Sequence, residues 1–313
     1  MERDEISERL VIKSREDLVD FMDKQTRWLI ENPDCFKDFL VMTSVMTKGH
    51  KEYDIGNKIL IYSQNMDARL LHSEEMWKRM GFELDKDSHP ILILGNNGGI
   101  NELYDISETS SKWLWIPRMT FRDKGEAAEM IIRARPCEIK FEVIEQVSKH
   151  AFYKYDDQVI AVTNGCKSYD SLFTDLACEY AHFEIAKIKK ERYLEKIRKA
   201  GKEEKPYKYQ RKPHAFHARC VSYALAKMYK LEPGNYDFSN VDEGLTSLNP
   251  EQIRTEADII LTAIKRIDKR FQNLLYNEPA VSMKADIAKR KDSEAEESEK
   301  SESDTQEKDE CDR

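Results

Sequence analysis

Most of the chain repeats apolar residues every three or four positions, which is the spacing of one face of an α-helix. The clearest case follows Asn249, where a capping residue, a proline at the first helical position and Gln252 precede the pattern. Its apolar members are Ile253, Ala257, Ile260, Leu261, Ile264, Ile267 and Phe271. Further helices are expected at 15–31, 35–46, 55–65, 73–81, 123–135, 170–200 and 214–230. The pattern predicts a mainly helical fold.

A few short segments have the character of β-strands instead. The run "PILILG" (90–95) is typical of a buried strand, and "NELYDISE" (101–108) follows it after a glycine-rich turn. The segment "FYKYDDQVIAVTN" (152–164) predicts a hairpin that turns at Asp156–Asp157. The fold class is therefore α+β and mainly helical, with a small N-terminal α/β domain, a boundary near Pro117 and a second domain that contains the hairpin.

Composition favours a cytoplasmic protein with no membrane contact. The chain has 313 residues, of which 40% are hydrophobic and 35% are charged. No run approaches the roughly 18 apolar residues that a membrane span needs, and "MERDEISERL" has no apolar signal segment. Six cysteines lie at positions 35, 137, 166, 178, 220 and 311 without a CxxC pair. This usage indicates reduced thiols.

The formal charge of −8 comes from one end of the chain. Residues 292–313 hold 11 acidic and 3 basic residues, which gives −8 and leaves the first 291 residues neutral on balance. The segment has no aromatic or branched apolar residue, so we expect a disordered acidic tail. It is either a solubilising tail or a nucleic-acid mimic that competes for a basic groove.

One helix resembles a zinc site with a substituted ligand. The segment "DLACEYAHFEIAK" (175–187) would contain HExxH if Cys178 were histidine. Residues i and i+4 of a helix lie side by side, so Cys178 and His182 are the candidate ligands and Glu179 the candidate catalytic base. A third ligand would come from "HAFHARC" (214–220), which offers His214, His217 and Cys220. Alternatively, these are ordinary half-buried helix residues.

Arg219 in the same segment argues against a metal. A guanidinium keeps its positive charge and repels a dication placed beside it. We therefore predict that Arg219 takes the place of the metal and pairs with Glu179, which would otherwise be a buried carboxylate without a counter-charge.

Residues 187–212 are strongly basic. They hold 12 basic and 4 acidic residues, a local charge of +8, with Tyr193, Tyr207 and Tyr209 among them. Basic charge with interleaved aromatic residues is typical of a nucleic-acid surface. A solvated helix end with internal Glu–Lys pairs is the alternative, and the acidic tail folded onto this region is a third.

The first half of the chain resembles the N-terminal domain of ArdC-type antirestriction proteins. The stretch 53–111 carries the resemblance at Tyr53, Asn57, Leu60, Ile61, Gln64, Asp67, Ala68, Trp77, Gly81 and Tyr104, while "KDSHP" (86–90) replaces the family's basic glycine turn. The resemblance implies binding of single-stranded DNA. Such binding needs cations for phosphates and flat side chains for bases. In both halves together, the candidate nucleic-acid contacts are Lys58, Tyr62, Arg69, Arg79, Lys189, Lys190, Arg198, Lys199, Lys208 and Arg211. Trp77 is expected in the core.

The second half is similar to the zincin-like domain of LtrC-like proteins of plasmids and conjugative elements. The segments that carry this resemblance are "YKYDDQVIAV", "DLACEYAHFEIA", "HARCVSYALAKMYKLEPGNYDFSNV" and "PEQIRTEADIILTAI". On this alignment the family's first histidine falls on Cys178 and its ligand glutamate on Arg219, whereas Glu179 and His182 are retained. The resemblance therefore implies a degenerate metal site at Cys178, His182, His217 and Arg219.

These observations predict three parts: an ArdC-like single-stranded-DNA-binding domain (1–117), a degenerate zincin-like domain (118–280) and an acidic disordered tail (281–313). The expected function is an antirestriction-like, single-stranded-DNA-binding protein of a plasmid, conjugative element or phage, without a cofactor. Single-stranded DNA is the expected partner, with a host or element-encoded protein as a further one. The alternatives are a zinc metallopeptidase that uses Cys178, His182 and His217 as ligands and Glu179 as base, or a non-catalytic scaffold.

Overall fold

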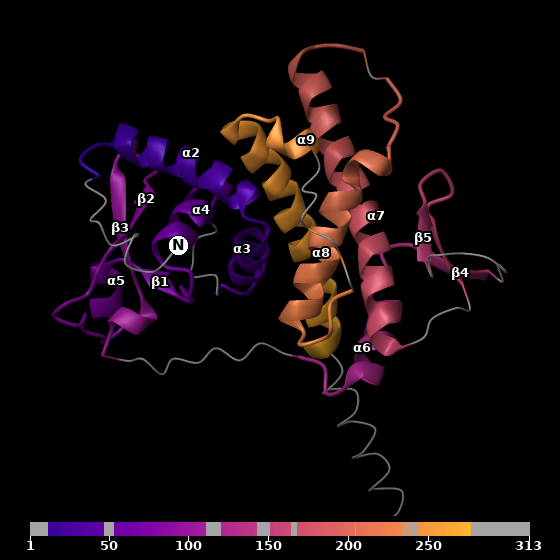
Figure 1. Ribbon diagram of the computed structural model, residues 1–313, viewed down its shortest axis with the longest axis horizontal. Coiled ribbons are helices and arrows are strands. Elements are labelled where there is room, and N and C mark those ends of the chain that lie inside the picture. Colours follow the sequence, from indigo (N-terminus) through magenta and orange to yellow (C-terminus); the bar gives the residue numbers. More distant parts are fainter. Residues whose placement is uncertain are drawn as a thin grey trace, which may run out of the picture. The chain divides into compact units, whose positions relative to one another are not determined.

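The computed structural model describes residues 12–46, 53–110, 120–142, 151–163, 168–203, 205–234, 236, 238 and 243–276. Contacts divide the chain into a unit that ends at Asp268 and a second that begins at Lys269, of which residues 269–276 are described and helical. Within the described residues the fold is α+β and mainly helical, with two three-stranded sheets (Figure 1), as the sequence predicted. The expected boundary at Pro117, the acidic tail, Cys166 and Cys311 lie outside these residues.

Three helices open the described chain, and each begins at a residue that favours a helix start. Helix α2 (Arg15–Glu31) starts with the predicted capping box of Ser14 and Asp17. Helix α3 (Pro33–Val45) has its proline at the first helical position, and the Asp54 side chain caps α4 (Ile55–Gln64). Their apolar faces form the core of this half, where Leu18, Phe39 and Leu60 are fully buried.

The first sheet is antiparallel and has the strand order β1-β3-β2. Its strands are β1 (Leu71–His72), β2 (Ile91–Leu94) and β3 (Ile100–Asp105). Strands β2 and β3 pair from Ile91–Leu103 to Leu94–Ile100, and the short helix η1 (Ile106–Glu108) follows β3. Helix α5 (Glu74–Arg79) lies beside β1, and the chain turns after it at Gly81, whose φ of +84° suits a glycine.

Two amide side chains of α4 cover the outer edge of β2. The Asn57 amide accepts from the N–H of Leu94 at 2.8 Å and donates to its carbonyl at 3.0 Å. Gln64, two turns later, does the same for Leu92 at 2.9 and 2.8 Å. Each amide thus substitutes for a residue of a further strand, which satisfies an otherwise unpaired sheet edge. This pairing fixes α4 against the sheet.

Two aromatic side chains of this half belong to the core. Trp77 is fully buried and donates from Nε1 to the carbonyl of Tyr104 at 2.9 Å, which confirms the prediction for it. Tyr62, expected to contact nucleic acid, is 1% exposed, donates to the carbonyl of Cys35 at 3.0 Å and packs edge-on against Phe39. The prediction for Tyr62 was wrong, because its ring lies on the apolar face of α4 and no base can reach it.

The second half begins with α6 (Lys124–Arg133) and a sheet of order β4-β6-β5. The predicted hairpin is present as β5 (Ala151–Lys154) and β6 (Val159–Thr163). Strand β4 (Glu138–Glu142) was not predicted, and it pairs in parallel with β6 from Glu138–Val159 to Glu142–Thr163. Further along lie the short helices η2 (Lys212–His214) and α9 (Glu243–Thr246), and a helix at 250–276.

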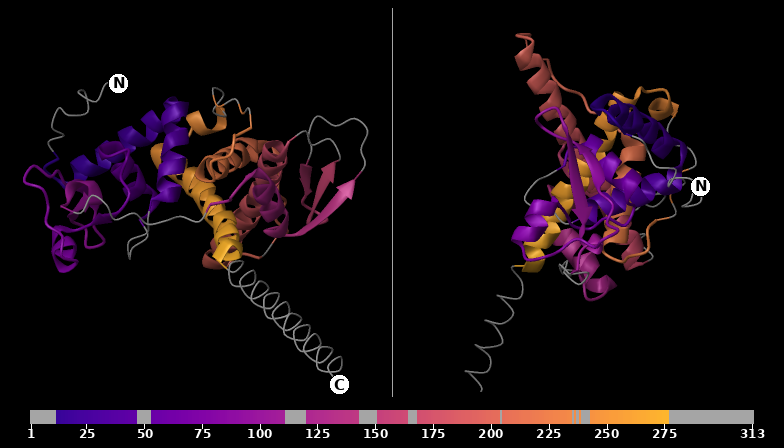
Figure 2. Two further views of the ribbon diagram at one scale, coloured as in Figure 1. Left: turned by 90° about the horizontal axis from the view of Figure 1, so that it is seen from below. Right: turned by 90° about the vertical axis from the view of Figure 1, so that its left-hand side faces the viewer.

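Helix α7 (Tyr169–Lys199) is the longest helix in the described part of the chain and organises this half. It packs against α8 (Ala215–Met228) on one side and against the β4–β6–β5 sheet on the other (Figures 1 and 2). Its last turns project beyond α8, and the chain then returns along α7 to reach η2 (Figure 1). In the described residues, no helix has both the length and the apolar composition that crossing a bilayer requires.

We predict that Phe39→Ala destabilises the first half by about 3–5 kcal/mol, because it removes a fully buried ring that packs against Phe36 and Tyr62. Met66→Ala, at a side chain 43% exposed, should change the free energy of unfolding by less than about 0.5 kcal/mol. Urea unfolding of both variants measures this difference, and equal effects would contradict the placement of Phe39.

Candidate functional site

The centre of the second half is the carboxylate of Glu179, whose side chain is 3% exposed in the middle of α7. Arg211 binds it with both guanidinium nitrogens: Nη1 donates to Oε2 at 2.5 Å, and Nη2 donates to Oε1. The backbone N–H of Tyr153, in β5, also donates to Oε2 at 2.5 Å. One buried carboxylate therefore joins the helix, the sheet and the chain segment that precedes η2.

Arg211 keeps its positive charge beside the Glu179 carboxylate. Burial lowers the pKa of Arg211, but hydrogen bonds to Glu179 and the charge of that carboxylate outweigh burial and raise it above its ordinary value. Two parallel N–H···O bonds are the geometry in which arginine binds a carboxylate most strongly. The negative charge of Glu179 is thus balanced by a side chain of the same protein. The carboxylate cannot act on a water molecule while this ion pair persists.

The predicted pairing of Arg219 with Glu179 was wrong. In the described part of the chain, the Arg219 guanidinium makes its hydrogen bond from Nε to the carbonyl of Ala215 at 3.3 Å, one turn earlier on α8. The expectation of a cation beside Glu179 is met, but by Arg211, which the sequence had suggested as a nucleic-acid contact. Arg211 reaches Glu179 because the chain returns along α7 before α8 begins (Figure 1).

His182, one turn after Cys178, is 2% exposed, and its Nδ1 lies 2.7 Å from the hydroxyl of Tyr209. Burial raises the pKa of that hydroxyl, so it remains protonated at neutral pH. Tyr209 also packs edge-on against the His182 ring and stacks on His214, with centroids 6.1 and 5.3 Å apart. The phenol therefore occupies one nitrogen of the candidate ligand.

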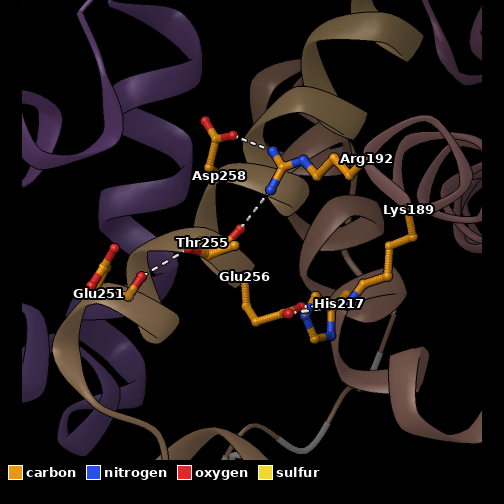
Figure 3. A network of polar contacts seen from close by, with 7 residues as sticks. All are labelled: Lys189, Arg192, His217, Glu251, Thr255, Glu256 and Asp258. Atoms are coloured by element: carbon orange, nitrogen blue, oxygen red, sulfur yellow. Dashed lines mark hydrogen bonds and ion pairs between the residues drawn. The ribbon is translucent and has the colours of Figure 1, made fainter. Parts of the chain in front are cut away.

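His217 belongs to a different cluster, shown in Figure 3. Its Nε2 lies 2.8 Å from Oε2 of Glu256, in the helix at 250–276, and Lys189 of α7 donates to both oxygens of that carboxylate at 2.9 and 3.0 Å. Burial raises the pKa of Glu256, but the hydrogen bonds from His217 and Lys189 prevail and lower it to about 2. Nearby, Arg192 donates to Asp258 at 2.5 Å. These contacts tie α7 and α8 to the last helix.

The donor set does not fit a zinc ion. Within the described residues, no three His, Cys, Asp or Glu side chains gather closely enough to hold a metal. Cys178 is half-buried, His182 is bonded to Tyr209, and His217 is bonded to Glu256. The alternative ligand set of Cys178, His182 and His217 is therefore not brought together, and a guanidinium lies on the carboxylate that would serve as base.

The candidate nucleic-acid contacts separate into two groups. The first group is Lys189 and Arg211, whose side chains are only 20% and 31% exposed, and each makes an ion pair with a carboxylate. Arg69, Arg79, Lys190, Arg198, Lys199 and Lys208 are exposed, and Lys58 is half-buried. Two of the exposed cations have helical neighbours as partners: Arg79 pairs with Glu75 and Lys199 with Glu195.

Sequence reasoning missed three parts of the site: the backbone donor at Tyr153, the phenol of Tyr209 and the carboxylate of Glu256. A signal for the second was present, because Tyr207, Tyr209 and Arg211 alternate with polar residues in "YKYQRK" (207–212). This period of two is typical of an extended segment with one face against the protein. Glu256 had no comparable signal, since it is one charged residue in a helix with many.

We predict that Arg211→Ala destabilises the protein by about 3–5 kcal/mol, because it leaves the Glu179 carboxylate buried without a counter-charge. Arg219→Ala is the matched control and should cost about 1 kcal/mol or less, since it removes one hydrogen bond within a helix. Chemical unfolding at neutral pH distinguishes the two arginines. A larger cost at Arg219 would restore the pairing expected from the sequence.

We predict a loss of stability in acid that depends on Glu256. The pKa of this carboxyl is about 2 in the folded protein against an ordinary 4.5, so its contribution is complete above pH 4.5 and is lost as the pH falls towards 2. The shift corresponds to about 3 kcal/mol. Urea unfolding of the unaltered protein and of Glu256→Gln between pH 5 and 2 measures it. Identical pH dependence in the two proteins would refute the assignment.

Comparisons with known proteins give a limited result. No family model and no curated protein matches the chain. Among solved structures, it is similar to the metal-free crystal structure of the antirestriction protein ArdC from plasmid R388, with a TM-score of 0.46 and 14% identity over 83% of this chain and 98% of that one. The Mn(II)-bound structure of that protein gives a TM-score of 0.40 and 13% identity over 72% and 85% of the two chains.

Proposed function

We propose that this protein binds single-stranded DNA as an antirestriction-like protein of a plasmid, conjugative element or phage, and that its zincin-like half is not a catalyst. The observation that carries the DNA-binding part is the sorting of basic side chains along 187–212. Some are held by carboxylates, as in Lys189 with Glu256 and Arg192 with Asp258. The remainder lie exposed: Lys187, Lys190, Lys196, Arg198, Lys202, Lys205, Lys208 and Lys212.

These exposed cations offer what a phosphate backbone requires. They lie on the last turns of α7 and on the segment that follows it, the part that projects beyond α8 (Figure 1). Tyr193 and Tyr207 are half-buried beside them, with ring centroids 5.6 Å apart. A cationic path with aromatic rings at its side binds single strands without a need for base sequence. A single strand that the protein binds in this way is shielded from enzymes that act on it.

The non-catalytic part of the proposal rests on Arg211. A general base must be free to take a proton from water, and a metal site must leave its ligands free to coordinate. The guanidinium occupies both oxygens of Glu179, and Tyr209 occupies a nitrogen of His182. These contacts support a helix that keeps the residues of a zinc site as structural groups.

We predict that a labelled oligo-dT binds the protein with an affinity that falls steeply between 50 and 200 mM salt. Lys190→Ala/Arg198→Ala/Lys208→Ala should weaken this binding and reduce the slope of log K against log salt by about 2, because each lost phosphate contact contributes about 0.7. Fluorescence anisotropy measures both quantities. The control is Lys24→Ala/Lys227→Ala, which removes two exposed lysines from α2 and α8.

Zinc analysis of the purified protein separates this proposal from the peptidase. Stoichiometric zinc that His182→Ala abolishes, together with peptide cleavage that a chelator stops, would replace the proposal by the alternative. Absence of both DNA binding and zinc would leave a non-catalytic scaffold. An equal loss of affinity in the control variant would show that the binding is not located on the end of α7.

A further inference from the structure

Residues 205–212, which we call the strap, return along α7 (Figure 1). Residues 205–210 lie in no helix or strand, Arg211 has helical dihedral angles (φ −68°, ψ −45°), and Lys212 begins η2. From 207 to 212 the side chains alternate between two environments. Tyr207, Tyr209 and Arg211 are half-buried, whereas Lys208, Gln210 and Lys212 are exposed. This burial pattern gives the strap one face on the protein and one face in solvent.

The inward face is anchored at several points along α7. Tyr207 packs against Tyr193, Tyr209 lies with its hydroxyl 2.7 Å from Nδ1 of His182, and Arg211 holds both oxygens of Glu179. These contacts follow one another along α7 in the reverse order of the strap. A segment that lies mostly outside helices and strands is thereby held against α7.

The outward face carries positive charge. Lys208 and Lys212 are exposed, and within the described residues neither makes an ion pair. A fully extended chain would hold the two positions at most about 13 Å apart, and the turn into η2 at Arg211 and Lys212 brings them closer. They can meet neighbouring phosphates of one strand. Their positions are set by the anchors on the inward face, by the stacking of Tyr209 on His214 and by η2, in which the N–H of His214 donates to the carbonyl of Arg211.

We propose that the strap couples nucleic-acid binding to the contacts that Tyr209 and Arg211 make with His182 and Glu179, an inference that rests on the proposed function. The anchors hold Lys208 and Lys212 ready for phosphates, so binding does not have to order the segment. By reciprocity, a bound single strand stabilises the strap on α7 and with it these two contacts. Glu179 and His182, which resemble residues of a catalytic centre, thus anchor the protein's own DNA-contacting segment.

Glu179→Gln provides a test in which two explanations predict opposite signs. If only net charge matters, loss of a carboxylate strengthens the binding of a polyanion. If the strap must be anchored, Glu179→Gln weakens the Arg211 contact and lowers the affinity for oligo-dT by about tenfold. The slope against salt should change little, because no phosphate contact is removed. Glu195→Gln, an exposed carboxylate on the same helix, is the matched control and should bind as well as the unaltered protein or better.

Tyr209→Phe keeps the ring and every charge and removes only the hydroxyl that lies on His182. We expect it to weaken binding about threefold and to speed hydrogen exchange of the amides in 205–212, while oligo-dT slows that exchange in the unaltered protein. This variant carries the test if Glu179→Gln does not fold. Affinity in both variants equal to or above that of the unaltered protein would overturn the coupling while leaving the proposed function intact. Failure of the unaltered protein to bind oligo-dT would overturn both.

Discussion

A carboxylate buried in the middle of a long helix requires a positive partner, and the second half of this protein is arranged around that requirement. Glu179 is almost completely excluded from solvent, and a carboxylate left there without a counter-charge would cost several kcal/mol. Arg211 supplies the charge from one side and the N–H of Tyr153 completes the shell from another. Helix α7, the edge strand β5 and the strap are therefore positioned by one side chain.

The same constraint recurs a few turns later with a different solution. Glu256 receives Lys189 from α7 and His217 from α8, so a second carboxylate, this one half-buried, joins three helices that apolar packing alone would allow to slide. Polar groups that must all be satisfied restrict the arrangements open to a helical core. Of the residues expected at a metal site, Glu179 and His182 are engaged near the first carboxylate and His217 at the second, while Arg219 bonds within α8. This division explains why they do not converge.

The sequence predicted most helices because their apolar periods and, in α2, α4, α5, α6 and α7, their capping residues are local properties. Strand β4 was not predicted because it pairs in parallel with β6. This pairing joins Glu138 to Val159, and such a contact leaves no local pattern in the sequence. Arg219 was preferred to Arg211 for a related reason. A helical residue can be assigned to a face from its spacing, whereas the path of the strap depends on its contacts with α7. The physical argument for a cation beside Glu179 was correct, and the identity of that cation required the fold.

The basic stretch shows why a charge count cannot locate a binding surface. Its net charge treats Lys189, Arg192 and Arg211 as equal to Lys190 and Lys208, although the first three are held by carboxylates and add little field at the surface. Only cations that exchange solvent counterions for phosphates contribute to salt-dependent affinity. The paired cations act instead through geometry, since they determine where the exposed ones lie. A surface of this kind needs both groups of cations, because the paired cations determine whether the exposed cations are held in a single arrangement.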